Sequence, residues 1–367
     1  MEFPRQLSVY QATAILISTI IGVGVLPLPL FAVRAADTGA PLVTFIGIMV
    51  AFFGLAVVTK LGMRFPEKSI IGYSEDVLGK WLGRIGSLVL IAFFAVLTGL
   101  AAREFGQVVI TTILPETPLE ISVIVMLLLA SVSSRNDINT FAYIHVFYLP
   151  ALIAPVLIII ILSLGNASNS LYLQPLWGND PSGMITGGLT VAALLQGSFI
   201  ITMIIPFMRF PQKAMKATIW GVITAGGVYV LIVAATLAMF GPEELKNLLW
   251  PSLELARATS LPGEFLQRLD VIFLVVWVTA VYTTIYASYM FTAHSLSQLF
   301  RLRDHKMFSF CILPLIFIIA MIPQNTLHMY EIVQMVGRLG LILTILYPIL
   351  LYVIALLRKK KGRKRSE

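Results

Sequence analysis

The chain has 367 residues, of which 58% are hydrophobic and only 12% charged, and its formal net charge is +8. With a mean hydropathy of +0.91, this composition excludes an ordinary soluble domain and predicts an integral membrane protein built from helices. The one cysteine, Cys311, excludes an intramolecular disulfide.

Apolar segments follow one another along nearly the whole chain, separated by short connections. Because a helical span needs about 20 apolar residues, we predict an all-α polytopic protein with ten spans in a single transmembrane domain, 1–367. The predicted spans are 10–33, 40–63, 86–112, 120–134, 141–163, 185–208, 215–240, 270–297, 307–323 and 332–357. Two connections, 67–84 and 250–268, mix apolar and charged residues and predict short surface helices.

Lysine and arginine predict the orientation of these spans. They are enriched in alternate connections and in the tail 358–367, and such residues mark the cytoplasmic side. With an even number of spans, both termini are expected in the cytoplasm. A basic tail directly after a span is expected to contact anionic lipid, and we expect no nucleic-acid partner.

The first span is interrupted in its middle. Residues 20–29 contain Gly22, Gly24, Pro27 and Pro29, and these residue types break backbone hydrogen bonding, which a membrane tolerates only in protein or beside a cavity. The break therefore predicts a binding site. Close helix packing is an alternative role for each glycine.

The sixth span carries a similar break, formed by Leu195, Gln196, Gly197 and Ser198. Two breaks five spans apart are typical of a five-plus-five inverted repeat, with the first repeat at about 10–163 and the second at about 185–357. Free N–H groups at such breaks suit a carboxylate, and free carbonyls suit an ammonium or a cation. An amino acid zwitterion fits that chemistry.

Several segments resemble a known family. Residues 22–27, Gly-Val-Gly-Val-Leu-Pro, resemble the first-helix signature of the amino acid-polyamine-organocation transporter superfamily. Residues 78–83, 112–120, 250–256 and 265–270 resemble, in order, segments of the B subunit of spore germinant receptors, the endospore germination permease family.

This resemblance implies a nutrient receptor in the inner membrane of a bacterial spore, with its termini on the spore core side. It also implies two partners, a larger membrane A subunit and a lipoprotein C subunit, and a small nutrient ligand, commonly an amino acid. An autonomous amino acid permease, coupled to a cation or a proton, is the alternative. A mainly structural subunit is a third possibility.

In the family fold the third and eighth spans wall the pocket, together with the two breaks. Leu97 and Ala101 lie one turn apart and leave room for a small side chain but no partner for a charged one. The expected ligand is therefore a small neutral amino acid. The predicted ligand-binding residues are Ile21, Gly22, Val23, Gly24, Phe93, Leu97, Thr98, Ala101, Leu195, Gln196, Gly197, Ser198, Tyr282, Thr283 and Thr284.

Charged residues at membrane depth also invite a functional interpretation. Glu104 in the third span and Arg338 in the tenth are predicted to pair as a candidate outer gate. Separate solvation in an outer vestibule is the alternative.

No nucleophile set, phosphate loop or zinc signature occurs in the sequence, so we predict no enzyme activity, no cofactor and no metal site of clustered side chains. The fifth span has no lysine, which removes one route of proton coupling known in the superfamily. A sodium-like site of first-span carbonyls with hydroxyls of Thr283, Thr284 or Ser288 stays open as an alternative.

Overall fold

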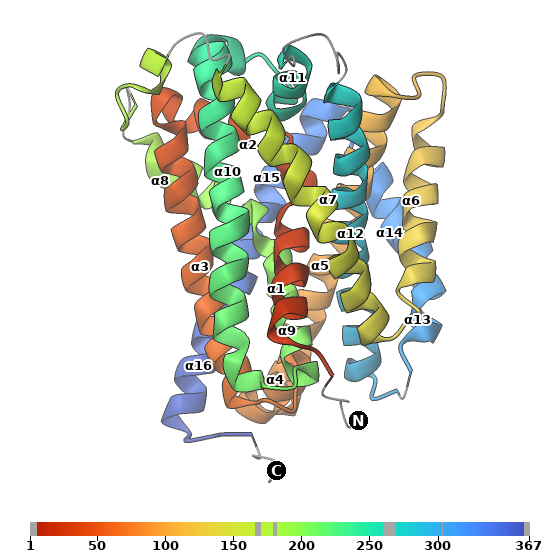
Figure 1. Ribbon diagram of the computed structural model, residues 1–367. Coiled ribbons are helices and arrows are strands. Elements are labelled where there is room, and N and C mark those ends of the chain that lie inside the picture. Colours follow the sequence, from red (N-terminus) through yellow and green to blue (C-terminus); the bar gives the residue numbers. More distant parts are fainter. Residues whose placement is uncertain (1–5, 166–169, 179–181, 260–268, 303, 363–367) are drawn as a thin grey trace.

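The computed structural model describes residues 6–165, 170–178, 182–259, 269–302 and 304–362. Nearly all of these residues are helical, and among them the only extended pairing is an isolated bridge between Leu7 and Met208. The long helices run side by side in an elongated bundle (Figure 1). The predicted all-α class is confirmed. Much of the 265–270 segment and the last part of the basic tail, 363–367, lie outside the described residues.

Helices and single helical turns alternate along the chain, with η1 to η6 denoting 3-10 turns and η7 a π-helical turn. The first half contains α1 (Val9–Ile20), η1 (Val23–Val25), α2 (Leu28–Ala36), η2 (Asp37–Gly39), α3 (Ala40–Arg64), α4 (Ile70–Leu78), α5 (Lys80–Thr112), α6 (Leu119–Ser133), α7 (Ile138–Gly165) and η3 (Ser170–Leu173). The second half contains α8 (Gly183–Leu194), η4 (Gln196–Ile200), α9 (Ile201–Ile204), η5 (Ile205–Phe207), η6 (Pro211–Lys213), α10 (Ala214–Leu245), α11 (Pro251–Ala258), α12 (Leu269–Leu299), α13 (Lys306–Cys311), α14 (Leu313–Met321), α15 (Thr326–Leu341), η7 (Ile342–Leu346) and α16 (Tyr347–Leu357).

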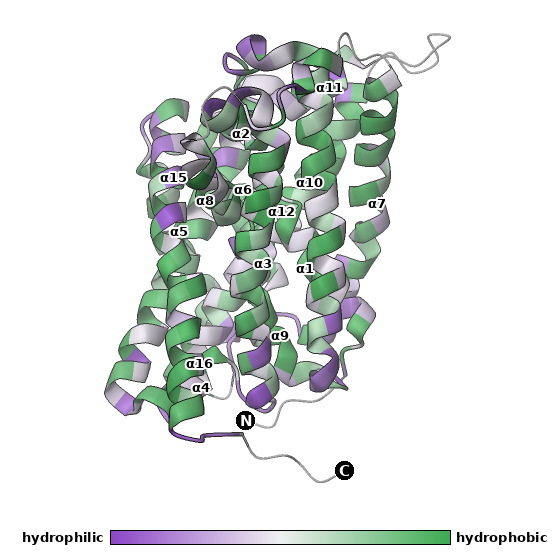
Figure 2. Cartoon of the chain, turned by 90° about the vertical axis from the view of Figure 1, so that its left-hand side faces the viewer, coloured by the Kyte–Doolittle hydropathy of each residue, from purple (hydrophilic) through white to green (hydrophobic). Residues whose placement is uncertain are grey.

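The bundle has the surface of a membrane protein. By length and composition, 6 helical segments of the described chain can cross a membrane, or 7 if the bent pair Gly183–Leu194 and Gln196–Phe207 counts as one span. Figure 2 shows hydrophobic residues along the middle of the bundle and hydrophilic residues concentrated toward its two ends. The chain is therefore an integral membrane protein. The count of ten spans and the inverted repeat stay predictions.

The first long apolar segment is broken where its glycines and prolines lie. α1 begins at a capping box, in which Ser8 Oγ accepts a hydrogen bond from the Gln11 N–H at 3.2 Å. It ends at Ile20, and Gly22 has φ −144° and ψ −129°, outside the helical region. Regular helix resumes only in α2, which carries a proline in its first turn, where a helix tolerates it.

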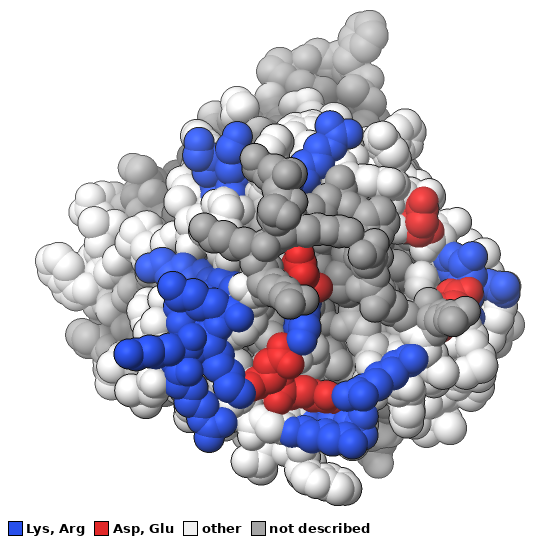
Figure 3. Space-filling view, turned by 90° about the horizontal axis from the view of Figure 1, so that it is seen from below, with Lys and Arg blue, Asp and Glu red and all other residues white. Residues whose placement is uncertain are grey.

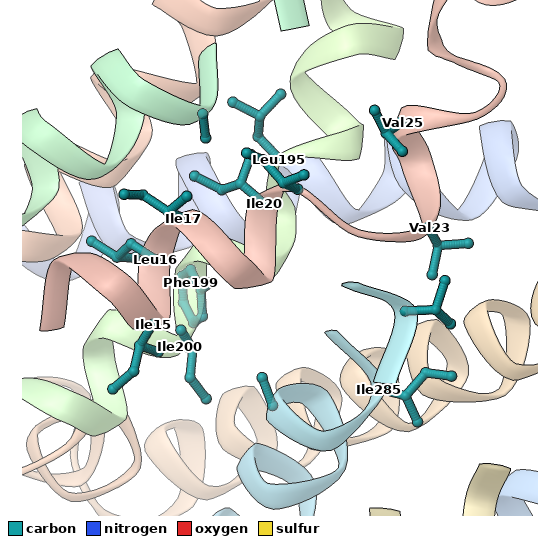
Figure 4. Packing of buried hydrophobic residues seen from close by; sticks show 14 of the residues in the cluster. Ile15, Leu16, Ile17, Ile20, Val23, Val25, Leu195, Phe199, Ile200 and Ile285 are labelled. Carbon is teal, nitrogen blue, oxygen red and sulfur yellow. The ribbon is translucent and has the colours of Figure 1, made fainter. Parts of the chain in front are cut away.

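The sixth predicted span is broken as well. α8 stops at Leu194, the chain tightens into the 3-10 turn η4, and the helical pieces on either side are bent by 47°. Pro206 lies further along, in η5. The two breaks are neighbours in space, since a Cβ on Gly197 would lie 2.6 Å from the carbonyl oxygen of Thr19. Figure 4 shows the end of α1 near Ile20 beside Leu195.

Helices far apart in the sequence interleave in the bundle. α3 packs against α8 and α10, and α5 packs against α12. Small residues allow this approach: a Cβ on Gly47 would lie 2.6 Å from Val191 Cβ and 2.7 Å from the carbonyl oxygen of Gly188. Such contacts give membrane helices the close packing that hydrophobicity alone does not provide in lipid.

Both termini lie at the lower end of the bundle (Figure 1). Figure 3 shows lysine and arginine side chains on this face gathered around a few acidic ones. Glu75 of α4 accepts from Arg84 at 3.0 Å and from Arg301 at 2.9 Å, which ties α4 to α5 and to the segment after α12. Arg358 donates to the Val77 carbonyl at 3.0 Å, so the chain after α16 docks on α4.

Candidate functional site

An internal cavity lies between the two helix breaks. It offers about 110 Å³ to water-sized molecules, and it is walled by α1, η1, α2, α5, α8, η4, α12 and α15. Its wall consists of Thr19, Ile20, Val23, Gly24, Phe31, Phe94, Leu97, Leu100, Ala101, Glu104, Thr190, Ala193, Leu194, Gln196, Gly197, Thr284, Ala287, Ser288, Val333, Gln334 and Gly337. Most of these groups are apolar, with a few polar groups among them, which is typical of a site for a small molecule.

Seven of the predicted ligand-binding residues line this cavity. They are Val23, Gly24, Leu97, Ala101, Gln196, Gly197 and Thr284. Glu104, predicted as half of an outer gate, lines it too. The structure therefore brings residues of four predicted spans, the first, third, sixth and eighth, to one wall. Whether these residues contact a ligand stays a prediction.

The third predicted span presents one face of α5 to the cavity. Its wall residues are Phe94, Leu97, Leu100, Ala101 and Glu104. Steps of three and four residues keep side chains on one side of a helix. Phe93 and Thr98 are predicted for the same wall, but neither lines the cavity. The Thr98 hydroxyl donates to the Phe94 carbonyl of its own helix at 2.7 Å.

The eighth predicted span contributes one of its three predicted residues. Thr284 lines the cavity, whereas Thr283 contacts the carbonyls of Ser18 and Ala280 at 3.1 and 2.8 Å. Tyr282 does not line the cavity, and its hydroxyl shares a hydrogen bond with Ser133 Oγ at 2.6 Å. The Thr283 hydroxyl is thus engaged with the backbone, which weakens the sodium-like interpretation.

Residues of the sixth-span break line two different cavities. Gln196 lines both the central cavity and a second, smaller pocket, while Leu195 and Ser198 line only the second. Gln196 Nε2 donates to the Gly337 carbonyl at 2.7 Å, and its Oε1 has no partner among the described residues. Ile21 of the first break lines a separate small pocket.

Gly22 has a packing role. A Cβ there would overlap the hydroxyl of Thr284 and lie 2.9 Å from its Cβ, so the glycine lets α12 approach the first break. Gly22 itself does not line the cavity. Of the two roles that the sequence left open for this glycine, the geometry favours close packing.

Backbone carbonyls at the first break already have hydrogen-bond donors. The Tyr229 hydroxyl donates to the Ile20 carbonyl at 2.5 Å. The Ser252 hydroxyl donates to the Val25 carbonyl at 2.7 Å. These contacts satisfy groups that a broken helix leaves without intrahelical partners. They also reduce the number of free carbonyls available to a ligand.

Glu104 belongs to a buried hydrogen-bond chain. Its Oε1 accepts from the Tyr330 hydroxyl at 3.2 Å, and that hydroxyl accepts from Trp250 Nε1 at 2.8 Å. Arg338 instead donates to Thr190 Oγ1 at 3.0 Å. Glu104 and Arg338 thus each have another hydrogen-bond partner in the structure, although Tyr330 lies on the same helix as Arg338. Their pairing as an outer gate stays a prediction.

Known proteins are similar to this chain over most of its length. A family profile described as spore germination protein matches residues 6–329. The chain belongs to the spore germination protein family. The spore germination protein YndE of Bacillus subtilis (strain 168) is 26% identical over 361 residues, which cover 97% of each chain. The spore germination protein B2 of the same organism is 24% identical, covering 98% of each chain, and GerLB of Bacillus cereus is 23% identical, covering 94% of this chain and 93% of its own.

The fold of this spore germination protein is also found in a solved transporter. A nucleobase-cation-symport-1 family transporter, in a closed conformation with bromovinylhydantoin bound, matches with a TM-score of 0.59 over 93% of this chain and 78% of its own. The two are 14% identical, so the likeness shows a transporter-like fold alone.

Sequence reasoning missed part of the wall of this germination protein. It assigned Glu104 to a gate, named Ser288 only for a sodium-like site, and overlooked Phe94, Thr190 and Gln334. The spacing of Leu97, Ala101 and Glu104 by four and three residues contained the signal for Glu104. The others depend on the rotation of each helix about its axis. No cluster of three or more metal-ligating side chains occurs among the described residues.

Proposed function

We propose that this chain is a nutrient germinant receptor subunit that binds a small, neutral amino acid in the central cavity and signals spore germination through partner subunits. One observation carries the proposal: both helix breaks open on the same cavity. Membership in the spore germination protein family, across residues 6–329, supports the physiological role. The proposal includes no catalytic step.

The residues that line the cavity favour a small, uncharged ligand side chain. Leu97 and Ala101 face it beside Phe94 and Phe31, so the space beyond the polar break is apolar. An apolar wall accepts a short aliphatic side chain and penalises a charged one, because a buried charge without a partner is costly. A small neutral amino acid satisfies both ends of the site.

Signalling in this proposal uses two alternative packing arrangements of the helices around the cavity. A ligand held between the breaks favours whichever arrangement of the two helical groups encloses it, and it shifts the equilibrium by its difference in affinity for the two states. We propose that a larger membrane A subunit and a lipoprotein C subunit receive this change. The location that goes with this role is the spore inner membrane, with both termini on the core side.

The basic tail is proposed to contact anionic lipid on that side. Part of its charge serves the protein itself, since Arg358 donates to the Val77 carbonyl of α4 at 3.0 Å. Lys360 Nζ likewise donates to the Asp76 carbonyl of α4. The net positive charge of the tail attracts anionic headgroups within about a Debye length.

An autonomous amino acid permease is the second candidate. The observation that favours it is the likeness of the fold to a solved transporter, at a TM-score of 0.59. In that case the same movement carries the ligand across the membrane.

Two measurements on the purified protein separate these functions: equilibrium binding of amino acids and uptake into liposomes. Binding without uptake supports the receptor subunit, and uptake supports the permease. Ala101→Phe fills the cavity and is expected to abolish binding. Ala92→Phe is the matched control, because Ala92 is exposed on the same helix. Absence of binding by the unmodified protein, or equal binding by both variants, contradicts the proposed site.

A further inference from the structure

Glu104 is the one carboxylate in the wall of the central cavity, and that wall contains no lysine or arginine. The side chain is deeply placed, with only 4% of the residue exposed. Its one hydrogen bond to a described side chain comes from the neutral Tyr330 hydroxyl, at 3.2 Å. The cavity therefore offers an acidic group without a cationic neighbour in its own wall.

The nearest basic residues do not supply that neighbour. Arg103 adjoins Glu104 in the sequence, but it does not line the cavity. Arg338 donates to Thr190. Because a buried carboxylate is costly unless a cation or a proton accompanies it, Glu104 needs either a proton in the empty site or a cation supplied by a ligand.

The broken backbone is a weaker acceptor for the cationic end of a ligand. Near the first break, the carbonyls of Ser18, Ile20 and Val25 already accept hydrogen bonds from side-chain hydroxyls. A carboxylate forms charge-assisted hydrogen bonds that are roughly twice as strong as neutral ones. An ammonium group in this cavity therefore forms its strongest hydrogen bond with Glu104.

We propose that Glu104 binds the ammonium group of the ligand in this cavity, so that the site selects primary amines. This rests on the proposed function, since it assumes that the cavity is where the amino acid binds. The ligand then lies with its cationic end toward Glu104, leaving its carboxylate for the free N–H groups of a helix break.

The test uses Glu104→Gln, which removes the charge but keeps an oxygen that can accept from Tyr330. The probes are L-alanine and L-lactate, which differ in the ammonium group. We expect Glu104→Gln to weaken alanine binding by about ten- to a hundredfold and to leave lactate binding unchanged. Glu104→Asp, which retains the charge, should lose less. Glu116→Gln, on an exposed loop residue, is the matched control and should bind both probes normally.

Unchanged alanine affinity in Glu104→Gln overturns the inference, because it means that the carboxylate is neutral and does not pair with the ligand. In that event Ala101→Phe still reports on the proposed function: if it abolishes binding, the cavity remains the site. If the unmodified protein binds no amino acid, both proposals fall. Should Glu104→Gln not fold, Glu104→Asp tests the position of the carboxylate instead of its charge: the shorter side chain should weaken alanine binding more than lactate binding, and equal losses for the two probes contradict the proposal.

Discussion

The hydroxyl of Ser252 donates a hydrogen bond of 2.7 Å to the backbone carbonyl of Val25. Ser252 lies in the first turn of the short helix α11, and Val25 lies in the break of the first predicted span. Trp250, two residues before Ser252, reaches Glu104 in the cavity wall through Tyr330. One short segment therefore touches both the broken helix and the acidic group of the candidate site.

Ser252→Ala is expected to loosen this connection. The substitution leaves the Val25 carbonyl buried without its donor, at a cost of about 1 to 3 kcal/mol. We expect a lower temperature of thermal unfolding and weaker amino acid binding in the same preparation. Arg257→Ala changes an exposed position near the end of α11 and should do neither. Equal effects of the two variants would mean that the contact with the break is irrelevant.

Gly22 and Thr284 are predicted to be coupled energetically. Gly22→Ala places a methyl group against the Thr284 side chain and should destabilise the protein by about 1 to 3 kcal/mol through overpacking. Thr284→Gly removes the side chain that the new methyl group would meet. Gly22→Ala should therefore cost much less stability in the Thr284→Gly background than in the unmodified protein. A double-mutant cycle in thermal or denaturant unfolding measures this coupling. Additive effects would contradict the close packing of the first break on α12.

The network at the lower end of the bundle predicts a pH dependence. Burial raises the pKa of Glu75, but hydrogen bonds and charge from Arg84 and Arg301 lower it more, so the pKa is below its ordinary value. A carboxyl group with a lowered pKa in the folded state stabilises the protein above its unfolded pKa, and this contribution is lost as the pH falls through the lowered value.

Glu75→Gln tests this dependence. The variant should unfold at a lower temperature than the unmodified protein at neutral pH, and the difference should shrink as the medium becomes acidic. Glu116→Gln, at an exposed loop position, should follow the unmodified protein throughout. A difference that stays constant across the acidic range would show that the charge of Glu75 is not responsible.

The sequence predicted the helix breaks because their causes are local. Glycine and proline weaken a helix through their own backbone, and residues around Gly22 and Gly197 interrupt it in the structure, whereas Pro150 and Pro155 stay within α7. The burial of a side chain and the rotation of a helix about its axis depend instead on neighbouring helices. Leu97 and Thr98 are adjacent, yet only Leu97 faces the cavity, and no pattern in an almost uniformly apolar span distinguishes them.

Contacts between distant segments also could not be predicted from the sequence. Glu104 and Arg338 have opposite charges and similar predicted depth, which suggested a pair. Instead Tyr330 reaches Glu104, and Thr190 receives Arg338. Choosing among these partners requires the positions of three helices, α5, α8 and α15, relative to one another. The Trp250 contact needs in addition the path of the connection before α11.

Leu97 offers the sharpest test of ligand size. Its side chain forms part of the cavity wall beside Ala101, so Leu97→Ala should lengthen the apolar part of the site by about three carbon atoms. Each methylene that becomes buried adds about 0.8 kcal/mol. We therefore expect the affinity for valine or leucine to rise relative to alanine by roughly tenfold or more, measured as competition at equilibrium. Leu88→Ala is the control, since Leu88 is 53% exposed on the same helix. If both variants keep the original preference, Leu97 does not contact the ligand's side chain, and the apolar wall of the site must be sought on another helix.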